Sequence, residues 1–266
     1  MKTIAPDAGD ERFQSGAEKY AAYLDTREGR LRLDLAFANL LEFLPKDGES
    51  LRALDLGCGT GATALRLAKL GLHVTLLDAS RPMLDLAERA AREARVSDRI
   101  TLKHGDATEL EILFDAGSFD VIICHNILEY LEKPCAVLCD AARALRNSSG
   151  ILSILVRNQG GEVLKAAIKD GDLAASEQNL AAESARESLY GGNVRLFTAK
   201  RLHSLLAEAS LAISAERGVR VISDYLPAQI SREGEYEPIF ELEKKLGRRP
   251  EFAAVARYTH CLAHRA

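Results

Sequence analysis

The 266-residue chain has no tryptophan, only two methionines, and no apolar run approaching the ~20 residues that a membrane-crossing helix requires. Its first residues also lack the apolar core of a signal peptide. Because 47% of the residues are hydrophobic, the chain can nevertheless bury a sizeable core. We therefore expect a soluble cytoplasmic protein with no membrane partner.

Cysteines are few, and their spacing is uninformative. The five residues Cys58, Cys124, Cys135, Cys139 and Cys261 are odd in number and form no Cys-x-x-Cys pair. This argues against a disulfide framework and against a structural zinc site, so we expect no metal. Cys135 and Cys139 have helical i, i+4 spacing, but buried reduced thiols are the expected state.

Neither sign of charge dominates, since 35 Lys and Arg face 39 Asp and Glu for a net charge of −4. The global basic surface typical of nucleic-acid-binding proteins is absent. Any contact with a polynucleotide would therefore depend on a local basic patch. Composition leaves RNA open as a partner, and leaves the oligomeric state open as well.

From residue 51 onward, apolar runs alternate with amphipathic stretches. Strands are predicted at 51–56, 73–77, 100–104, 121–125 and 151–156, with helices at 61–70, 81–94 and 134–145. Nearly continuous β-branched and leucine runs separated by helices are typical of a parallel sheet covered on both faces. The sequence therefore predicts a doubly wound α/β core.

One segment, "LRALDLGCGTGATALRLAKLGLHVTLLDAS", carries the clearest motif. Asp55, Gly57, Gly59 and Gly61 follow the first strand, and Asp78 ends the second. Glycines let a ligand press against the backbone at a strand's carboxyl end, and the next helix points free N–H groups there. The carboxylate of Asp78 can accept the two hydroxyls of a ribose. These residues predict a nucleotide-like ligand.

Three interpretations fit the motif: a purely structural turn, an NAD site, or a site for another nucleoside cofactor. The spacing Asp-x-Gly-x-Gly-x-Gly resembles that of class I methyltransferases, which bind S-adenosylmethionine and release S-adenosylhomocysteine. The resemblance implies a mostly parallel, Rossmann-like sheet of seven strands. It also implies cofactor contacts from Ala79, Met83, Asp106, Ala107 and His125. A protein that binds the cofactor without turnover stays open.

The resemblance predicts one methyltransferase domain in four parts. Residues 1–48 form a tail and helices, 49–159 the cofactor-binding core, 160–198 an alanine-rich helical insertion or cap, and 199–266 the rest of the sheet. In this last part, helices are predicted at 199–209 and 236–246, and strands at 211–223 and 253–262.

Between Thr26 and Tyr258 the chain resembles a narrower family, the bacterial methyltransferases that esterify 5-carboxymethoxyuridine at the tRNA wobble position. The resemblance rests on "REGRLRLDL", the glycine loop, "HNILEY", "GVRVISDYL" and "EYEPIFELEKKLGRRPEFAAVARYTH". It implies the tRNA anticodon region as partner, and implies that Arg32 contacts the methionine carboxylate of the cofactor. A solvated surface arginine is the alternative for Arg32.

A carboxylate acceptor is ionised at neutral pH and can attack the sulfonium methyl group in line, without a catalytic base. His125 as a general base is the less favoured alternative. The acceptor's charge calls for a cation, and guanidinium fits the two oxygens of a carboxylate. The candidates for positioning the acceptor are Arg157, Asn158, Arg220, Tyr225, Arg257 and Tyr258. A surface salt bridge is the alternative for each arginine.

One departure from the tRNA enzymes is clear. They carry a lysine-rich tract after the fifth strand, whereas residues 170–189 contain only Arg186 as a positive residue. Phosphate contacts would then move to Arg195, Lys200, Arg201, Arg248 and Arg249. A small-molecule acceptor, bearing a carboxylate or a hydroxyl, remains the alternative substrate.

Overall fold

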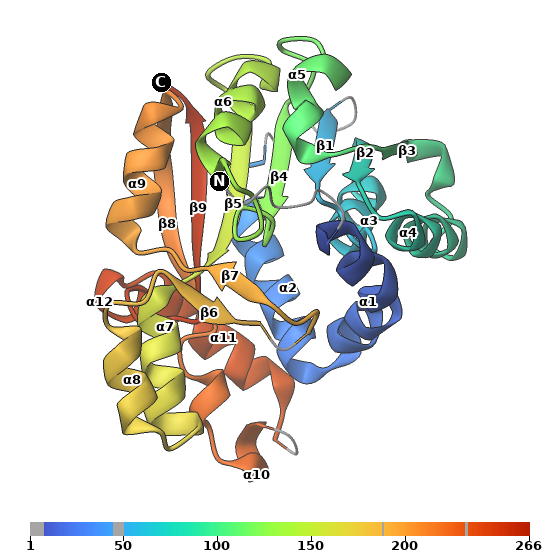
Figure 1. Ribbon diagram of the computed structural model, residues 1–266. Coiled ribbons are helices and arrows are strands. Elements are labelled where there is room, and N and C mark those ends of the chain that lie inside the picture. The colour runs from blue at the N-terminus through green and yellow to red at the C-terminus, as the bar shows by residue number, and fades with distance from the viewer. Residues whose placement is uncertain (1–7, 45–50, 188, 232–233) are drawn as a thin grey trace.

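The computed structural model describes residues 8–44, 51–187, 189–231 and 234–266 (Figure 1). Seven strands form the central sheet: β1 Arg52–Leu56, β2 His73–Asp78, β3 Ile100–His104, β4 Val121–His125, β5 Ile151–Arg157, β8 Leu211–Val219 and β9 Tyr258–Arg265. Their order is β3-β2-β1-β4-β5-β9-β8, and only β9 runs antiparallel to its neighbours. The predicted fold class is confirmed.

Helices cover both faces of this sheet, which is why its central strands are apolar on both sides. One face packs against α2 Arg27–Leu41, α3 Ala62–Lys69 and α4 Arg81–Glu93, the other against α5 Leu110–Leu113, α6 Pro134–Ala144 and α9 Ala199–Glu208. In β4 the first four residues are fully buried. No helix in the described ranges is long and apolar enough to cross a membrane.

The remaining elements lie near the carboxyl ends of the parallel strands, in the lower half of Figure 1. They are α1 Ala8–Asp25, α7 Gln159–Leu164, a π-helical turn Lys165–Lys169, α8 Leu173–Asn179, β6 Ser184–Arg186, β7 Asn193–Arg195, α10 Ala228–Ser231, α11 Tyr236–Gly247 and α12 Pro250–Ala253. Of these, α1, α7, the π-helical turn and β6 contribute residues to the site described below.

The insertion at 160–198 is helical only in its first part, so the prediction is wrong for its second part. There β6 and β7 form an antiparallel hairpin, joined by a turn in which Gly191 and Gly192 have φ values of 77° and 92°. Alanine-rich composition favours helix, but a long-range contact overrides it, because Glu187 pairs with Arg157 of β5.

Two strand boundaries also differ from the prediction. Strand β8 ends at Val219, because Arg220 takes a left-handed backbone with φ of 60°. The next three N–H groups donate to the carboxylate of Glu243 at 2.6–3.0 Å and not to a neighbouring strand. Residues 250–253 form α12, so the last strand begins at Tyr258.

Candidate functional site

A cavity of about 740 Å³ lies at the carboxyl ends of the parallel strands. Its volume falls within the roughly 300–1,000 Å³ typical of small-molecule sites. The predicted residues that line it are Arg32, Gly57, Gly59, Asp78, Ala79, Met83, Asp106, Ala107, His125, Arg157, Arg220, Arg257 and Tyr258. Asp55, Gly61, Asn158 and Tyr225 do not line it.

The glycine loop after β1 is held in a backbone conformation that side chains would block. Gly57 has φ of 66°, and a Cβ there would lie 2.5 Å from Ile127 Cδ1. Gly61 has φ of 73° and precedes the first residue of α3, where a Cβ would lie 2.8 Å from Leu76 Cδ2. Gly61 therefore shapes the loop without reaching the cavity.

Asp78, at the end of β2, fixes the same loop. Its Oδ2 accepts from the N–H of Gly59 at 2.7 Å, and its Oδ1 accepts from the N–H of Ser80 at 2.8 Å. Asp78 also lines the cavity, and a carboxylate oxygen can accept more than one hydrogen bond. It can therefore shape the loop and accept hydrogen bonds from a ligand at once.

Asp55 lies behind the loop and is 4% exposed. Burial, and then the nearby charge of Asp78, raise the pKa of Asp55 to about 7, although the N–H of Ala64 opposes the shift. A small neighbouring cavity of about 30 Å³ is lined by Asp55 and shares Gly57 and His125 with the larger one. Its position favours support of the loop over direct contact in the main cavity.

Beyond β3, the cavity is lined by Asp106 and Ala107. Asp106 caps a short 3-10 turn, since its Oδ1 accepts from the N–H of Thr108 at 2.7 Å. In return, the N–H of Asp106 donates to Glu109 Oε2 at 3.0 Å. This reciprocal capping fixes the wall of the cavity where Ala107 offers an apolar contact.

Arg32, on α2, is 8% exposed and lines the cavity. Its Nη1 donates to Asn126 Oδ1 at 3.0 Å and its Nη2 to the hydroxyl of Tyr20 at 3.1 Å. No carboxylate of the described residues pairs with it, since none of the ion pairs in these ranges includes Arg32. A cation held by neutral groups is suited to an anionic ligand.

His125, at the end of β4, is tied into the core. Its Nε2 lies 2.8 Å from Ser153 Oγ, which lies 2.8 Å from His260 Nε2, while Asn39 Nδ2 lies 3.3 Å from His260 Nδ1. The Asn39 amide donates to Nδ1 of His260, so Nε2 of His260 carries the proton and donates to Ser153 Oγ. The hydroxyl of Ser153 then donates to Nε2 of His125, whose own proton is therefore on Nδ1. Burial, and then His260 and Arg32, hold the pKa of His125 well below its usual value. Its Nε2 is thus already occupied as an acceptor.

Six charged residues on the other side of the cavity alternate in sign, and we call them the ion-pair chain. In order they are Glu187, Arg157, Glu162, Arg257, Asp224 and Arg220, and all six line the cavity. Arg157, at the end of β5, lies 3.3 Å from Glu187 and 3.4 Å from Glu162. Its side chain is 19% exposed, so these contacts are shielded from water.

The other residues of the ion-pair chain are more deeply buried. Arg257 Nη2 lies 3.0 Å from Glu162 Oε1, and its Nε lies 3.2 Å from Asp224 Oδ2. Arg220 Nε donates to Asp224 Oδ1 at 2.8 Å, and its Nη1 donates to the hydroxyl of Tyr23 at 3.1 Å. Three guanidinium groups therefore meet three carboxylates. The surface salt bridges considered as alternatives for these arginines are instead buried pairs.

Tyr258 lies between these arginines and Arg32. Its ring is 5.7 Å from the guanidinium carbon of Arg32 and 6.0 Å from that of Arg220. Burial alone would raise the pKa of Tyr258, but the four guanidinium groups, led by Arg157, lower it to about 8. The phenol is thus neutral at pH 7 and begins to ionise just above it.

Two residues predicted to position an acceptor have structural partners instead. Asn158 caps α7, and its Nδ2 donates to the carbonyls of Ala254 and Ala256 at 2.9 Å each. Tyr225 donates to the carbonyl of Gly161 at 3.4 Å. Neither residue lines the cavity, and each side chain is bonded to backbone carbonyls of neighbouring segments.

The sequence analysis missed an aromatic cluster that lines the cavity. Phe13 lies 5.0 Å, centroid to centroid, from both Tyr130 and Tyr190, and Tyr190 lies 6.0 Å from Tyr20. These rings come from α1, the loop after β4 and the hairpin loop. The sequence offered the spacing of Tyr20 and Tyr23 as a signal, but nothing that joined them to Tyr190. The three carboxylates of the ion-pair chain were also missed.

Comparisons with known proteins agree with this geometry. A family model described as a methyltransferase domain matches residues 53–148. The tRNA 5-carboxymethoxyuridine methyltransferase of Escherichia coli O157:H7 is 30% identical over 258 residues, covering 96% of this chain and 97% of that protein. Its counterpart in Escherichia coli strain K12 is 29% identical over 265 residues, with the same coverage.

Solved structures show the same fold at lower identity. Magnesium protoporphyrin IX methyltransferase from Synechocystis PCC 6803, with bound S-adenosylhomocysteine, gives a TM-score of 0.66 at 13% identity, covering 97% of this chain and 98% of that one. Geranyl diphosphate C-methyltransferase from Streptomyces coelicolor A3(2) gives 0.57 at 18% identity, covering 86% and 78%.

The ion-pair chain makes a prediction about stability. Replacing Asp224 by asparagine leaves two buried guanidinium groups without their shared counter-ion, which should lower the free energy of unfolding by about 3 kcal/mol. Urea denaturation measures the change. Glu241→Gln is the control, because it removes an exposed pair with Lys244 and should leave the urea midpoint unchanged. Equal midpoints for the two variants would contradict the interpretation.

Proposed function

Because this chain belongs to the class I S-adenosylmethionine-dependent methyltransferases, in the family of the Escherichia coli tRNA 5-carboxymethoxyuridine methyltransferases, we propose that it methylates the carboxylate of 5-carboxymethoxyuridine at the tRNA wobble position. The observation that carries this proposal is a cavity that combines buried arginines with a histidine, His125, whose Nε2 is already occupied as a hydrogen-bond acceptor. Action on tRNA would take place in the cytoplasm.

The cofactor would occupy the side of the cavity formed by Arg32 of α2 and by the segments that follow β1, β2, β3 and β4. Arg32 would pair with the methionine carboxylate, Asp78 would accept the ribose hydroxyls, and the N–H groups of the glycine loop would face the ligand. Asp106, Ala107, Ala79 and Met83 would surround the adenosine portion. His125, with Nδ1 protonated, would be a hydrogen-bond donor at the edge of this site and not a base.

The acceptor would enter between this side and the ion-pair chain, formed by residues 157–257. A carboxylate oxygen would attack the methyl carbon in line with sulfur. The anion and the sulfonium become a neutral ester and a neutral thioether, so charge disappears along the reaction. A strong unpaired cation would stabilise the reactant carboxylate more than the transition state. The ion-pair chain, in which the charges are balanced, is suited to orienting the acceptor carboxylate without stabilising the reactant over the transition state.

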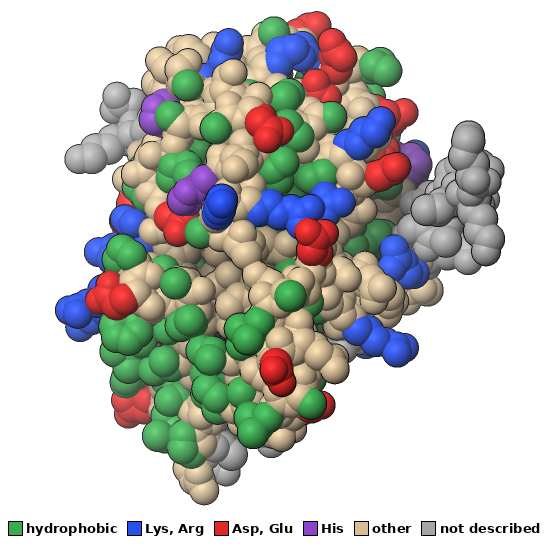
Figure 2. Space-filling model, turned by 60° about the vertical axis from the view of Figure 1, so that its left-hand side comes forward, with side chains coloured by type: hydrophobic (Ala, Val, Ile, Leu, Met, Phe, Trp, Pro, Cys, Tyr) green, Lys and Arg blue, Asp and Glu red, His purple; other side chains and the backbone are tan. Residues whose placement is uncertain are grey.

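The rim of the cavity could accommodate the phosphates of an RNA loop. Arg12, Lys165, Lys169 and Arg186 all line it. The two lysines lie on the π-helical turn before residue 170, so they partly replace the lysine-rich tract that the sequence lacks. Figure 2 shows a short row of Lys and Arg side chains near the middle of one face, with Asp, Glu and His side chains beside it. These cations support an RNA partner.

The direct test is nucleoside mass spectrometry of tRNA from a strain that lacks the gene. The proposal predicts loss of the methyl ester and accumulation of free 5-carboxymethoxyuridine, and persistence of the ester would refute it. Purified protein should then methylate tRNA that carries the free acid and not the same tRNA with unmodified uridine. Transfer to the free nucleoside, but not to tRNA, would favour a small-molecule acceptor, the alternative that the scarcity of positive residues at 170–189 supports.

Cofactor binding should depend on Arg32. Arg32→Ala removes a charge-assisted contact and should raise the dissociation constant for S-adenosylmethionine about 10- to 100-fold, as measured by calorimetry. Arg30→Ala is the matched control on the same helix, since its side chain is 66% exposed and pairs with Asp34 at 3.6 Å. An unchanged dissociation constant for Arg32→Ala would assign the methionine carboxylate to another residue.

Activity should fall at alkaline pH because of Tyr258. Its lowered pKa means that the phenol is neutral below about 8 and ionised above it, where the phenolate would oppose an anionic acceptor. kcat/KM for the tRNA acceptor should decline above that pH in the wild type and stay level in Tyr258→Phe. Tyr225→Phe, outside the cavity, should keep the wild-type decline, since burial raises the pKa of Tyr225 to about 12. A decline that survives Tyr258→Phe would contradict this role.

A further inference from the structure

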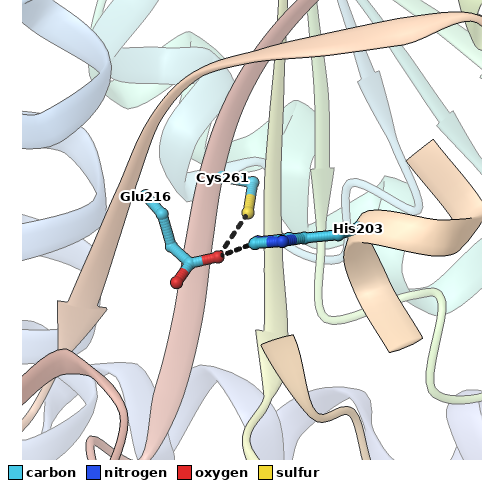
Figure 3. A group of neighbouring side chains, drawn as sticks. All are labelled: His203, Glu216 and Cys261. Carbon is cyan, nitrogen blue, oxygen red and sulfur yellow. Dashed lines mark hydrogen bonds and ion pairs between the residues drawn. The ribbon is translucent and has the colours of Figure 1, made fainter. Parts of the chain in front are cut away.

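Three potential metal ligands meet outside the cofactor cavity (Figure 3). His203 comes from α9, Glu216 from β8 and Cys261 from β9. His203 Nε2 lies 2.5 Å from Glu216 Oε2, and the thiol of Cys261 donates to the same oxygen at 3.7 Å. The three donor atoms lie within 4.8 Å of one another. Across the described ranges, no other such group of His, Cys, Asp and Glu was found.

The backbone holds these residues in place. Glu216 and Cys261 are direct partners in the pairing of β8 with β9, so their side chains share a face of the sheet. Helix α9 packs on that face through Leu202 and Leu206, which are fully buried. His203 therefore lies over the strand pair. The position of each ligand follows from the packing of secondary structure and not from a flexible loop.

The three side chains differ in their exposure to solvent, and the two exposed ones leave the group open to an ion from solvent. Cys261 is fully buried, whereas the side chains of His203 and Glu216 are 48% and 31% exposed. Among the described residues, no Lys or Arg nitrogen lies within 4.0 Å of the Glu216 carboxylate, and its ion-pair partner is His203. A metal ion can therefore reach the three donor atoms from solvent without displacing a Lys or Arg side chain from the Glu216 carboxylate.

We propose that His203, Glu216 and Cys261 form a binding site for Zn²⁺ or a similar transition-metal ion, independent of methyl transfer. Imidazole, carboxylate and thiolate are all zinc ligands, and the sulfur ligand disfavours Mg²⁺ and Ca²⁺. Three protein ligands leave one position of a tetrahedral ion to water. The thiol releases its proton to solvent when the sulfur–metal bond forms.

Bond lengths agree with this assignment. Zinc bonds of about 2.0–2.3 Å imply ligand separations of about 3.3 Å for nitrogen and oxygen and about 3.6 Å for sulfur and oxygen in a tetrahedron. The observed sulfur–oxygen distance of 3.7 Å already matches. The nitrogen–oxygen distance of 2.5 Å must widen by under ~1 Å, which the partly exposed His203 and Glu216 side chains can supply by rotation.

The site would clamp α9 onto the edge of the sheet. Strand β8 leads directly from Glu216 to Arg220, and β9 starts with Tyr258 three residues before Cys261. The metal would thus fix the two strands that carry acceptor-side residues, from the part of the fold outside the cavity. Cysteine spacing alone predicted no metal, because the three ligands are separated by 12 and 44 residues in the sequence.

Cobalt titration tests the site. Full-length protein carrying Cys135→Ser and Cys139→Ser, which removes the two more accessible thiols, is freed of metal with a chelator and titrated with Co²⁺. The proposal predicts a single equivalent of tetrahedral Co²⁺ with a sulfur-to-cobalt charge-transfer band, which Zn²⁺ displaces. Zn²⁺ should also raise the Tm of this protein.

Three variants and one control complete the experiment. His203→Ala and Glu216→Gln should weaken Co²⁺ binding more than about 100-fold, since changes to outer-shell residues already cost 10- to 100-fold. Cys261→Ser should abolish the charge-transfer band. His264→Ala, on the same strand and bonded to Ser214, should change nothing.

His203 is half exposed, so its variant should fold even if substitution of the buried Cys261 disturbs the core. Binding that survives His203→Ala, or no binding at millimolar Co²⁺, would overturn the proposal and leave an ion pair with a thiol donor. Both outcomes are independent of methyl transfer, so they leave the proposed function untouched.

Discussion

The site depends on the charge balance of the ion-pair chain from Glu187 to Arg220. Burying a single guanidinium group without a partner would cost several kcal/mol, so three arginines can line one cavity only because three carboxylates alternate with them. The ion-pair chain links the end of β5, α7, the loop of the β6–β7 hairpin, the segment after β8 and the residue before β9. Segments far apart in the sequence are thereby fixed around one space.

Arg32 differs electrostatically from the arginines of the ion-pair chain. Its partners are the neutral Asn126 and Tyr20, so its charge is available for an anion, whereas the charges of the chain are already compensated. The two sides of the cavity therefore differ in electrostatics although both contain arginine. In our account, the cofactor carboxylate takes the uncompensated cation. The reacting carboxylate meets a balanced surface, where the loss of charge on methylation is not opposed.

Backbone strain also occurs in residues that line the cavity. Asn126 and Arg220 have φ values of 55° and 60°, and both line the cavity. Asparagine tolerates this conformation, but arginine does so at a cost of about 1–3 kcal/mol, which the surrounding structure must offset. The carboxylate of Glu243 does this after Arg220, because it accepts the three following N–H groups. The turn thus aims Arg220 at Asp224 and Tyr23.

The sequence predicted the sheet, and most residues of the glycine-loop side that it singled out line the cavity, because both depend on local signals. The glycine loop and Asp78 lie within 22 residues, and apolar runs mark the central strands. The side of the cavity lined by the ion-pair chain depends on contacts between distant residues, such as Arg157 with Glu187 and Arg257 with Asp224. No local pattern announces them, so the counter-ions, the hairpin and the structural roles of Asn158 and Tyr225 were missed.

The most direct test of the central claim is the rate of a single turnover at saturating cofactor, measured from pH 5 to 7.5 on tRNA that carries 5-carboxymethoxyuridine. A carboxylate with an ordinary pKa near ~4 is ionised throughout this range and needs no base, so the account predicts a constant rate. A tenfold rise per pH unit through the range in which histidine titrates would show that a general base is required, and would contradict it.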